Sequence, residues 1–125
     1  MDLLLDTHVL MWAAISPEKL SAKVTHFIMN KDSNLFLSPV SLWEIAIKIN
    51  IGKSDIDLNV LLHHIPSLDV QIIQMKNEHF VTLLTLPNIH KDPFDRYLIS
   101  LAIKEKLTII TADENIQKYN VSWIW

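Results

Sequence analysis

The sequence predicts an α/β fold built on a mainly parallel sheet of about five strands. Short apolar runs alternate along the chain with longer stretches of helical periodicity, and this alternation is typical of stacked β–α units. The 125 residues are 50% hydrophobic and 20% charged, which is enough apolar material for a buried core. The length also lies within the roughly 100–200 residues of one ordinary domain. We therefore expect residues 1–125 to form a single domain.

The first half of the chain is expected to supply two strands and three helices. The best-marked boundary is Ser38-Pro39, because serine can cap the free amides of a helix and proline at the first helical position has no amide to leave unpaired. Gly52 supplies a C-terminal cap. The expected elements are strand Leu3–Leu5, helices His8–Ile15 and Ser21–Asn30, strand Leu35–Leu37 and helix Val40–Ile51.

The second half is expected to complete the sheet. In the last strand Val121, Trp123 and Trp125 alternate, so they should lie on one face, as a half-buried strand requires. The expected elements are helix Leu58–Ile65, strand Val70–Ile73, helices Asn77–Leu84 and Pro93–Lys106, strand Thr108–Thr111, a short helix within Asp113–Tyr119 and strand Val121–Trp125.

Two near-absences in the composition exclude whole classes of chemistry. Gly52 is the only glycine, so a Walker A loop, a dinucleotide-binding G-x-G-x-x-G turn and a G-x-S-x-G nucleophile elbow are all excluded. Cysteine is absent, which excludes disulfides, a thiolate nucleophile and cysteine-ligated zinc or iron–sulfur sites. The chemistry of this chain must therefore use oxygen and nitrogen groups.

Charge and hydropathy restrict the expected cellular location of the protein and its expected binding partners. The net charge is −3, from 11 Lys and Arg against 14 Asp and Glu, so no overall basic field indicates nucleic-acid or membrane binding. Met1–Leu5 lacks the positive region of a signal peptide. The longest uncharged runs, such as Val9–Pro17, fall far below the roughly 20 residues of a membrane span. We expect a cytoplasmic protein that does not enter a membrane.

Carboxylates follow two of the predicted strands. Asp6 comes directly after Leu3–Leu5, and Asp113 follows Thr108–Thr111. Ligands of open parallel sheets bind at the carboxyl ends of the strands. Asp95 lies in the first turn of the helix that leads into the second of these strands, and Glu44 lies in the helix that leaves Leu35–Leu37. All four carboxylates could therefore converge at one edge of the sheet.

The surroundings of Glu44 indicate a polar cleft. Only Ser41, Glu44 and Lys48 form a polar stripe on an otherwise apolar helix. Two carboxylates about 4 Å apart repel by roughly 4 kcal/mol at an effective dielectric near 20, so a cluster of four needs a positive partner. Oxygen donors without cysteine favour Mg²⁺ or Mn²⁺. Such an ion can activate a water and stabilise the leaving oxygen of a phosphodiester.

Each of these acids also has a purely structural explanation. Asp92 can cap the helix that begins at Pro93, and Asp95 suits the positive end of the same helix. Asp6 and Asp113 can cap the helices that follow them, and Glu44 can pair with Lys48 on an exposed face. Taken together these explanations require four independent coincidences at one edge of the sheet, which favours a shared site.

Other residues are weaker candidates. His63 and His64 are adjacent and no H-E-x-x-H spacing occurs, which disfavours a histidine-bound zinc. His8 and His90 lie close to the acidic residues in sequence and either touch substrate or form local hydrogen bonds. Arg96, the only arginine, could contact a phosphate or hold a carboxylate. The aromatic residues expected in the core rather than stacked on bases are Trp43, Phe94 and Tyr97.

Four segments, in this order and spacing, resemble the motifs of PIN-domain nucleases and, more narrowly, of the VapC-type toxins of bacterial toxin–antitoxin pairs. They are Leu4-Leu5-Asp6-Thr7-His8, Ser41-Leu42-Trp43-Glu44-Ile45, His90-Lys91-Asp92-Pro93-Phe94-Asp95-Arg96 and Thr111-Ala112-Asp113.

The resemblance implies a three-layer α/β/α sandwich and a metal-dependent endoribonuclease that arrests translation. By resemblance, Asp6, Glu44, Asp95 and Asp113 form the catalytic acidic quartet that binds Mg²⁺, with Asp6 and Asp95 foremost among the direct ligands. It further implies an RNA substrate, a cognate antitoxin protein and a homodimer. The positions expected to support the metal or contact the substrate are Thr7, Asp92, Arg96 and Thr111.

Two other functions remain open at this stage. A PIN-domain nuclease could act in RNA maturation without being a toxin. A receiver-like signalling module also gathers acids and Mg²⁺ at strand ends, but it needs a phosphoacceptor Asp after a central strand. Taking Leu35–Leu37 as the central strand, the residues that follow it are Ser38-Pro39, which disfavours this module.

Overall fold

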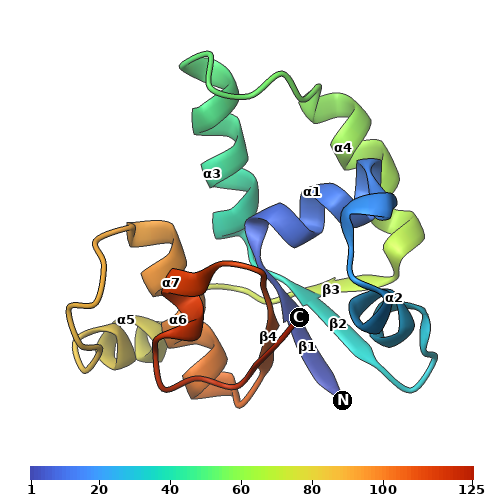
Figure 1. Cartoon of the computed structure of the whole chain (residues 1–125). Helices are drawn as coiled ribbons and strands as arrows, with labels where there is room; N and C mark the ends of the chain where they lie inside the picture. Colours follow the sequence, from blue (N-terminus) through green and yellow to red (C-terminus); the bar gives the residue numbers. More distant parts are fainter.

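A computed structural model describes residues 1–125, which form a fully parallel five-stranded sheet between layers of helices (Figure 1). The strands are β1 (Asp2–Leu5), β2 (Asn34–Leu37), β3 (Val70–Ile72), β4 (Thr108–Ile110) and β5 (Trp123–Ile124). Their order across the sheet is β3-β2-β1-β4-β5, and every neighbouring pair is parallel. The predicted α/β class and the parallel sheet of five strands are confirmed.

Helices cover both faces of this sheet. They are α1 (Thr7–Ile15), α2 (Ala22–Met29), α3 (Pro39–Asn50), α4 (Leu58–His64), α5 (Asn77–Leu83), α6 (Pro93–Glu105) and α7 (Glu114–Gln117), with 3₁₀ turns at Pro17–Lys19 and Ile65–Leu68. In Figure 1, α5, α6 and α7 lie on one side of the sheet, and α1, α2 and α4 lie on the other. This is the three-layer α/β/α arrangement that the resemblance implied.

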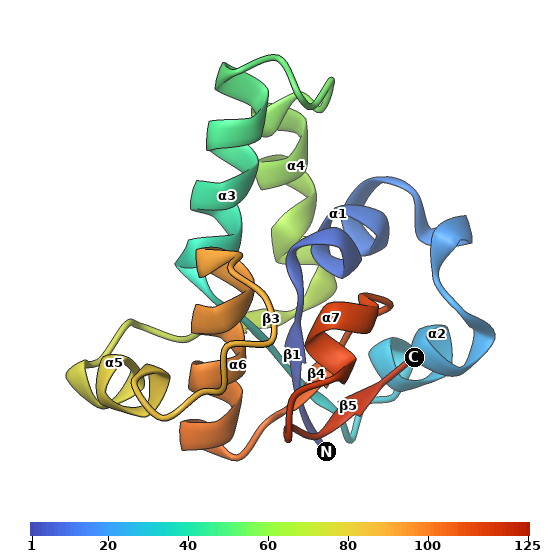
Figure 2. The ribbon, with the colours of Figure 1, turned by 60° about the vertical axis from the view of Figure 1, so that its left-hand side comes forward.

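Two apolar clusters hold the layers together. Leu4 belongs to the cluster under α6, whereas Leu3 and Leu5 belong to the cluster under α1 and α4. Helix α3 contributes Val40 to the first cluster and Ile45 to the second, so it packs across the edge of both layers. The carboxyl ends of the strands face α1, α3 and the N-terminal end of α6 (Figure 2).

The helix starts follow from local capping chemistry. The Ser38 hydroxyl accepts the Val40 amide at 3.2 Å, and Asp92 accepts the Asp95 amide at 2.9 Å. Each cap is followed by a proline at the first helical position, as the sequence predicted. Gly52, at φ +77°, follows α3 in the left-handed conformation that favours glycine.

Two expectations about the sheet are wrong. Val121, Trp123 and Trp125 do not share one face: Val121 packs with the cluster under α6, Trp125 packs with the opposite cluster, and Trp123 is 41% exposed. The reason is that the strand covers only Trp123–Ile124. Val121 lies before it in a tight turn, its amide bonded to the Tyr119 carbonyl at 2.9 Å, and Trp125 lies beyond it.

The central strand is β1, not the strand at Leu35–Leu37. Leu3, Leu4 and Leu5 are all fully buried, because a central parallel strand is covered on both faces. The residue that follows this central strand is Asp6, and not Ser38 as expected. No helix combines the length and apolar content needed to cross a bilayer.

Candidate active site

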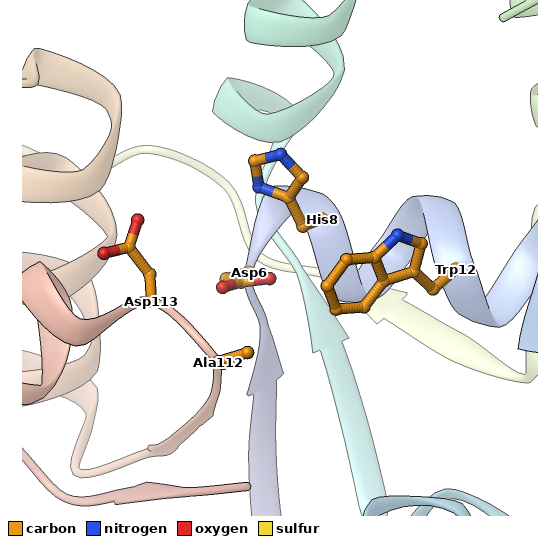
Figure 3. A pocket seen from close by; sticks show the side chains of 5 residues that line it. All are labelled: Asp6, His8, Trp12, Ala112 and Asp113. Carbon is orange, nitrogen blue, oxygen red and sulfur yellow. The ribbon is translucent and has the colours of Figure 1, made fainter. Parts of the chain in front are cut away.

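Asp6 and Asp113 lie together at the carboxyl edge of the sheet because their strands are neighbours. The Asp6 amide donates to the Ile110 carbonyl of β4 at 3.2 Å. A hollow of about 270 Å³ opens above this pair, lined by Asp6, His8, Trp12, Ala112 and Asp113. Figure 3 shows the Asp6 carboxylate on its floor, between Asp113 on one side and His8 and Trp12 on the other.

Asp6 caps α1 and also faces this hollow. Its Oδ1 accepts the Val9 amide at 2.7 Å, so the structural explanation is correct, but it accounts for only one of the two carboxylate oxygens. The side chain is almost fully buried. Burial raises the pKa of Asp6 and the nearby Asp113 adds to this rise, whereas the Thr111 side chain, the Val9 amide and His8 oppose it.

Asp95 is placed by the first turn of α6. Burial raises its pKa to about 6; the hydrogen bond to His90 opposes this rise, and the carboxylates of Asp92, Asp113 and Glu44 add to it. His90 Nε2 lies 3.1 Å from Asp95 Oδ2. The structure therefore brings Asp95 within electrostatic range of Glu44 and Asp113, two of the other three predicted site acids.

Glu44 is buried and already paired. Its Oε1 accepts the Thr7 hydroxyl at 2.8 Å, and its Oε2 lies 2.7 Å from Lys48 Nζ. The predicted Glu44–Lys48 pair is present, but Glu44 is only 3% exposed, so the expectation of an exposed face is wrong. Thr7 Oγ1 also lies 3.2 Å from Ser41 Oγ, and the polar stripe of α3 therefore points inward, toward α1.

Lys48 brings a positive charge to the acidic cluster. The hydrogen bond to Glu44 raises the pKa of Lys48, partial burial opposes the rise, and the charges of Glu44, Asp92 and Asp95 add to it. From the sequence, Lys48 is expected as part of the stripe on α3 and as a partner of Glu44 on an exposed face, but not as a member of the site. Its spacing of four residues from Glu44 was the signal that it belongs to the site.

Asp92 and Asp113 combine capping with a place near the cluster. Asp113 Oδ1 accepts the Asn115 amide at 2.8 Å and so caps α7. The Asp113 amide in turn donates to the Thr111 hydroxyl at 3.0 Å. The structural explanations for both caps are correct, and the charge of each carboxylate still raises the pKa of Asp95.

The chemistry of this donor set fits a hard divalent cation. The carboxylates come from four separate segments, and burial together with mutual repulsion disfavours the ionised forms of Asp6 and Asp95. A divalent cation would reverse this effect. The side chains do not place three His, Asp or Glu groups around one point. Glu44 is paired with Lys48, and one oxygen of Asp95 is paired with His90.

One expectation about the aromatic residues near the site is wrong. Trp43 is 60% exposed rather than in the core and packs edge to face on Phe94, with ring centroids 5.2 Å apart. It lies on the outer side of α3, beside an apolar groove. Phe94 is partly buried and Tyr97 is buried, as expected.

Arg96 does not hold a carboxylate. Its Nη1 donates to the Pro87 carbonyl at 2.8 Å and to the Tyr119 hydroxyl at 2.9 Å. The guanidinium also lies 5.9 Å from the centre of the Tyr119 ring. Tyr119 had no signal in the sequence, because nothing in its local pattern connects it to the distant segment around Asp95.

The fold and the site define an α/β protein with acidic residues gathered at the carboxyl edge of a parallel sheet. The PIN domain family model matches residues 3–121, and the chain belongs to this family. PIN domains are generally nucleases, which supports a hydrolase acting on nucleic acid. The family match confirms the resemblance seen in the motifs and does not support a receiver-like module.

The fold is also similar to those of solved VapBC structures. One is a chain of VapBC2 from Rickettsia felis, solved bound to a DNA fragment from the VapBC2 promoter. It is 16% identical in sequence, has a TM-score of 0.75, and the match covers 100% of this chain and 99% of that chain. A chain of VapBC-1 from nontypeable Haemophilus influenzae shares 16% identity with a TM-score of 0.67, covering 99% and 97%. A chain of DNA-bound VapBC from Salmonella typhimurium shares 12% identity with a TM-score of 0.70, also covering 99% and 97%. At these identities the likeness is one of fold. Among curated proteins, none matches this sequence.

Proposed function

We propose that this protein is a Mg²⁺-dependent endoribonuclease and the toxin of a type II toxin–antitoxin pair, with residues 1–125 acting as one nuclease domain. Asp6, Glu44, Asp95 and Asp113 are its catalytic acids. The observation that carries the proposal is the placement of buried Asp6 and of Asp95, both with raised pKa values, at the carboxyl edge of a PIN-family sheet.

Asp6 and Asp95 would hold the ion, with Asp113 beside Asp6 and Glu44 available if it turns from Lys48. When bound, Mg²⁺, or Mn²⁺ in its place, would supply an activated water and stabilise charge on the scissile phosphate. Thr7 orients Glu44 through its 2.8 Å bond, and Thr111 supports Asp6 and the Asp113 backbone. Asp92 fixes the first turn of α6 on which Asp95 stands.

The charge balance is compatible with RNA as substrate. Of the 14 acidic residues, four are the proposed site acids, which leaves ten against 11 basic residues. The surface outside the site is therefore close to neutral. RNA binding would depend on the metal and on local contacts such as Lys48 more than on long-range steering.

RNA cleavage by the purified protein tests the enzyme. We expect cleavage with Mg²⁺, none with EDTA, and none by Asp6→Asn or Asp95→Asn protein. Asp55→Asn is the matched control, because Asp55 is exposed in the segment between α3 and α4, and it should cleave normally. Undiminished cleavage by Asp6→Asn or Asp95→Asn would refute the assignment of these residues.

The toxin role and its partners need a test in cells. We propose that the protein acts in the cytoplasm as a homodimer and binds a cognate antitoxin, supported by the fold it shares with chains of VapBC complexes. Expression should arrest growth, the Asp95→Asn variant should not, and co-expression of a small protein encoded beside this gene should restore growth and co-purify. RNA cleavage without growth arrest would favour an RNA-maturation nuclease instead.

A further inference from the structure

The Tyr119 hydroxyl joins three segments that are far apart in sequence. Tyr119 lies just after α7 and is buried. Its oxygen lies 2.9 Å from Arg96 Nη1, 3.2 Å from the His90 amide and 2.8 Å from His90 Nδ1. The other ring nitrogen of His90, Nε2, lies 3.1 Å from Asp95 Oδ2. A continuous chain of contacts therefore runs from Arg96 through Tyr119 and His90 to Asp95.

The donors and acceptors around the Tyr119 hydroxyl fix the direction of each hydrogen bond in this series. A phenol oxygen can accept two hydrogen bonds and donate one. Arg96 and the His90 amide can only donate, so they occupy both acceptor positions of Tyr119. Its own proton must then be donated, and His90 Nδ1 at 2.8 Å is closer than the other available acceptor, the His90 carbonyl at 3.4 Å.

The consequence for His90 is a defined tautomer. Because Nδ1 accepts from Tyr119, the proton of the neutral ring lies on Nε2, where it is donated to Asp95 Oδ2. With the proton on Nδ1 instead, Nε2 would face Asp95 Oδ2 as a second acceptor, and Nδ1 would face the Tyr119 hydroxyl as a third donor.

We propose that Tyr119 is a positioning residue that, through the tautomer of His90, orients the Asp95 carboxylate for a divalent cation. This inference rests on the proposed function, in which Asp95 is a metal ligand. The His90 bond engages Oδ2 alone and leaves Oδ1 for the ion. Groups that orient a ligating carboxylate typically change metal affinity 10- to 100-fold when they are removed.

Binding of Mn²⁺ alone to the RNA-free protein, followed by electron paramagnetic resonance, tests the inference. Tyr119→Phe keeps the ring and its packing but removes the hydroxyl, and it should weaken Mn²⁺ binding about tenfold. His90→Gln is the matched background. The amide nitrogen of glutamine can donate near the Nε2 position, and because an amide has no tautomers to choose between, it does not need the Tyr119 hydroxyl to do so. In that background Tyr119→Phe should change Mn²⁺ affinity by less than about twofold. An equal loss in both backgrounds, or no loss in either, would overturn the inference.

Two further measurements separate this inference from the proposed function. If Asp95→Asn binds Mn²⁺ as tightly as the unaltered protein, the proposed metal site fails. If Asp95→Asn weakens Mn²⁺ binding but Tyr119→Phe does not, the metal site stands and this inference fails. Nitrogen NMR of the histidine rings reads the tautomer without metal and without a variant. We expect His90 with its proton on Nε2, and a proton on Nδ1 would contradict the inference whatever the variants do.

Discussion

Lys48 Nζ lies 2.7 Å from Glu44 Oε2, although the Glu44 carboxylate is buried and Lys48 is partly exposed. The lysine therefore compensates a charge that the fold places in the acidic cluster. Its pKa is raised by the bond to Glu44 and further by the charges of Asp92 and Asp95. In the absence of a cation, Lys48 is the positive group that holds this part of the cluster together.

Removal of Lys48 is expected to destabilise the metal-free protein. Lys48→Met keeps most of the aliphatic side chain but leaves Glu44 buried with only the Thr7 bond. We expect the free energy of unfolding in EDTA to fall by about 1–2 kcal/mol, below the loss for a fully buried pair because Lys48 is partly exposed. Urea denaturation measures this change, and Mg²⁺ should restore part of it. Lys104→Met, at an exposed position of α6, should have little effect; an equal loss there would contradict the assignment.

The stability of the metal-free protein should depend on pH through Asp95. The pKa of Asp95 is raised from 3.8 to about 6, so the folded state binds this proton more tightly than the unfolded state. The associated stability is present below about pH 4 and is lost as the pH rises through 6. Burial raises the pKa of Asp6 in the same direction. Glu105 acts in the opposite direction, because the His79 bond lowers its pKa from 4.5. The stability from Glu105 is present above about pH 4.5 and is lost as the pH falls below that value.

Urea denaturation in EDTA at pH 5 and pH 7.5 measures this dependence. Asp95→Asn should stabilise the protein at pH 7.5 more than at pH 5, because only the ionised carboxylate is penalised by burial. Comparing the variant with the unaltered protein removes the contribution of groups that both share. An Asp95→Asn effect of the same size at both pH values would contradict the raised pKa.

His79 is expected to matter for stability and not for the site. It is fully buried on α5, with Nε2 at 2.7 Å from Glu105 and Nδ1 at 3.0 Å from the Tyr97 hydroxyl, and Ser100 donates to its carbonyl. His79→Ala removes these side-chain bonds between α5 and α6 and should lower the free energy of unfolding by about 2–3 kcal/mol. Mn²⁺ affinity, measured below the unfolding transition, should stay within about twofold. A loss of affinity as large as that of Asp95→Asn would contradict this separation.

Local chemistry explains which parts of the fold could be predicted from the sequence. Ser38 and Asp92 each precede a proline, so the starts of α3 and α6 were set by a few neighbouring residues. The order of the strands depends instead on pairing between distant segments, and β1 was not recognised as central. The unbroken Leu3-Leu4-Leu5 run carried that information, since a strand covered on both faces has no alternation.

The same distinction applies to the candidate site. Asp6 and Asp113 could be placed at one edge because each follows a strand, and parallel strands share their carboxyl edge. Tyr119 could not be found, because its link to Asp95 exists only once the segment after α7 folds back against the loop before α6. Trp43 was misplaced because α3 is apolar on most sides, so the pattern did not show which of them faces solvent.

Asp6 provides the sharpest separation between folding and catalysis. Its Oδ1 caps α1 through the Val9 amide, and asparagine caps a helix about as well as aspartate. Asp6→Asn should therefore keep the cap, remove a buried charge and unfold in EDTA at pH 7.5 with a free energy equal to or above that of the unaltered protein.

Asp6→Ala loses the cap as well and should be less stable than Asp6→Asn by about 1 kcal/mol. Both variants should lack RNA cleavage and bind Mn²⁺ weakly, because the lost carboxylate is what the ion requires. Urea denaturation and Mn²⁺ titration on the same preparations compare the two properties. If Asp6→Asn lost stability as Asp6→Ala does while still cleaving RNA, Asp6 would be a helix cap and nothing more, and the metal would have to be held by Asp95, Asp113 and Glu44 alone.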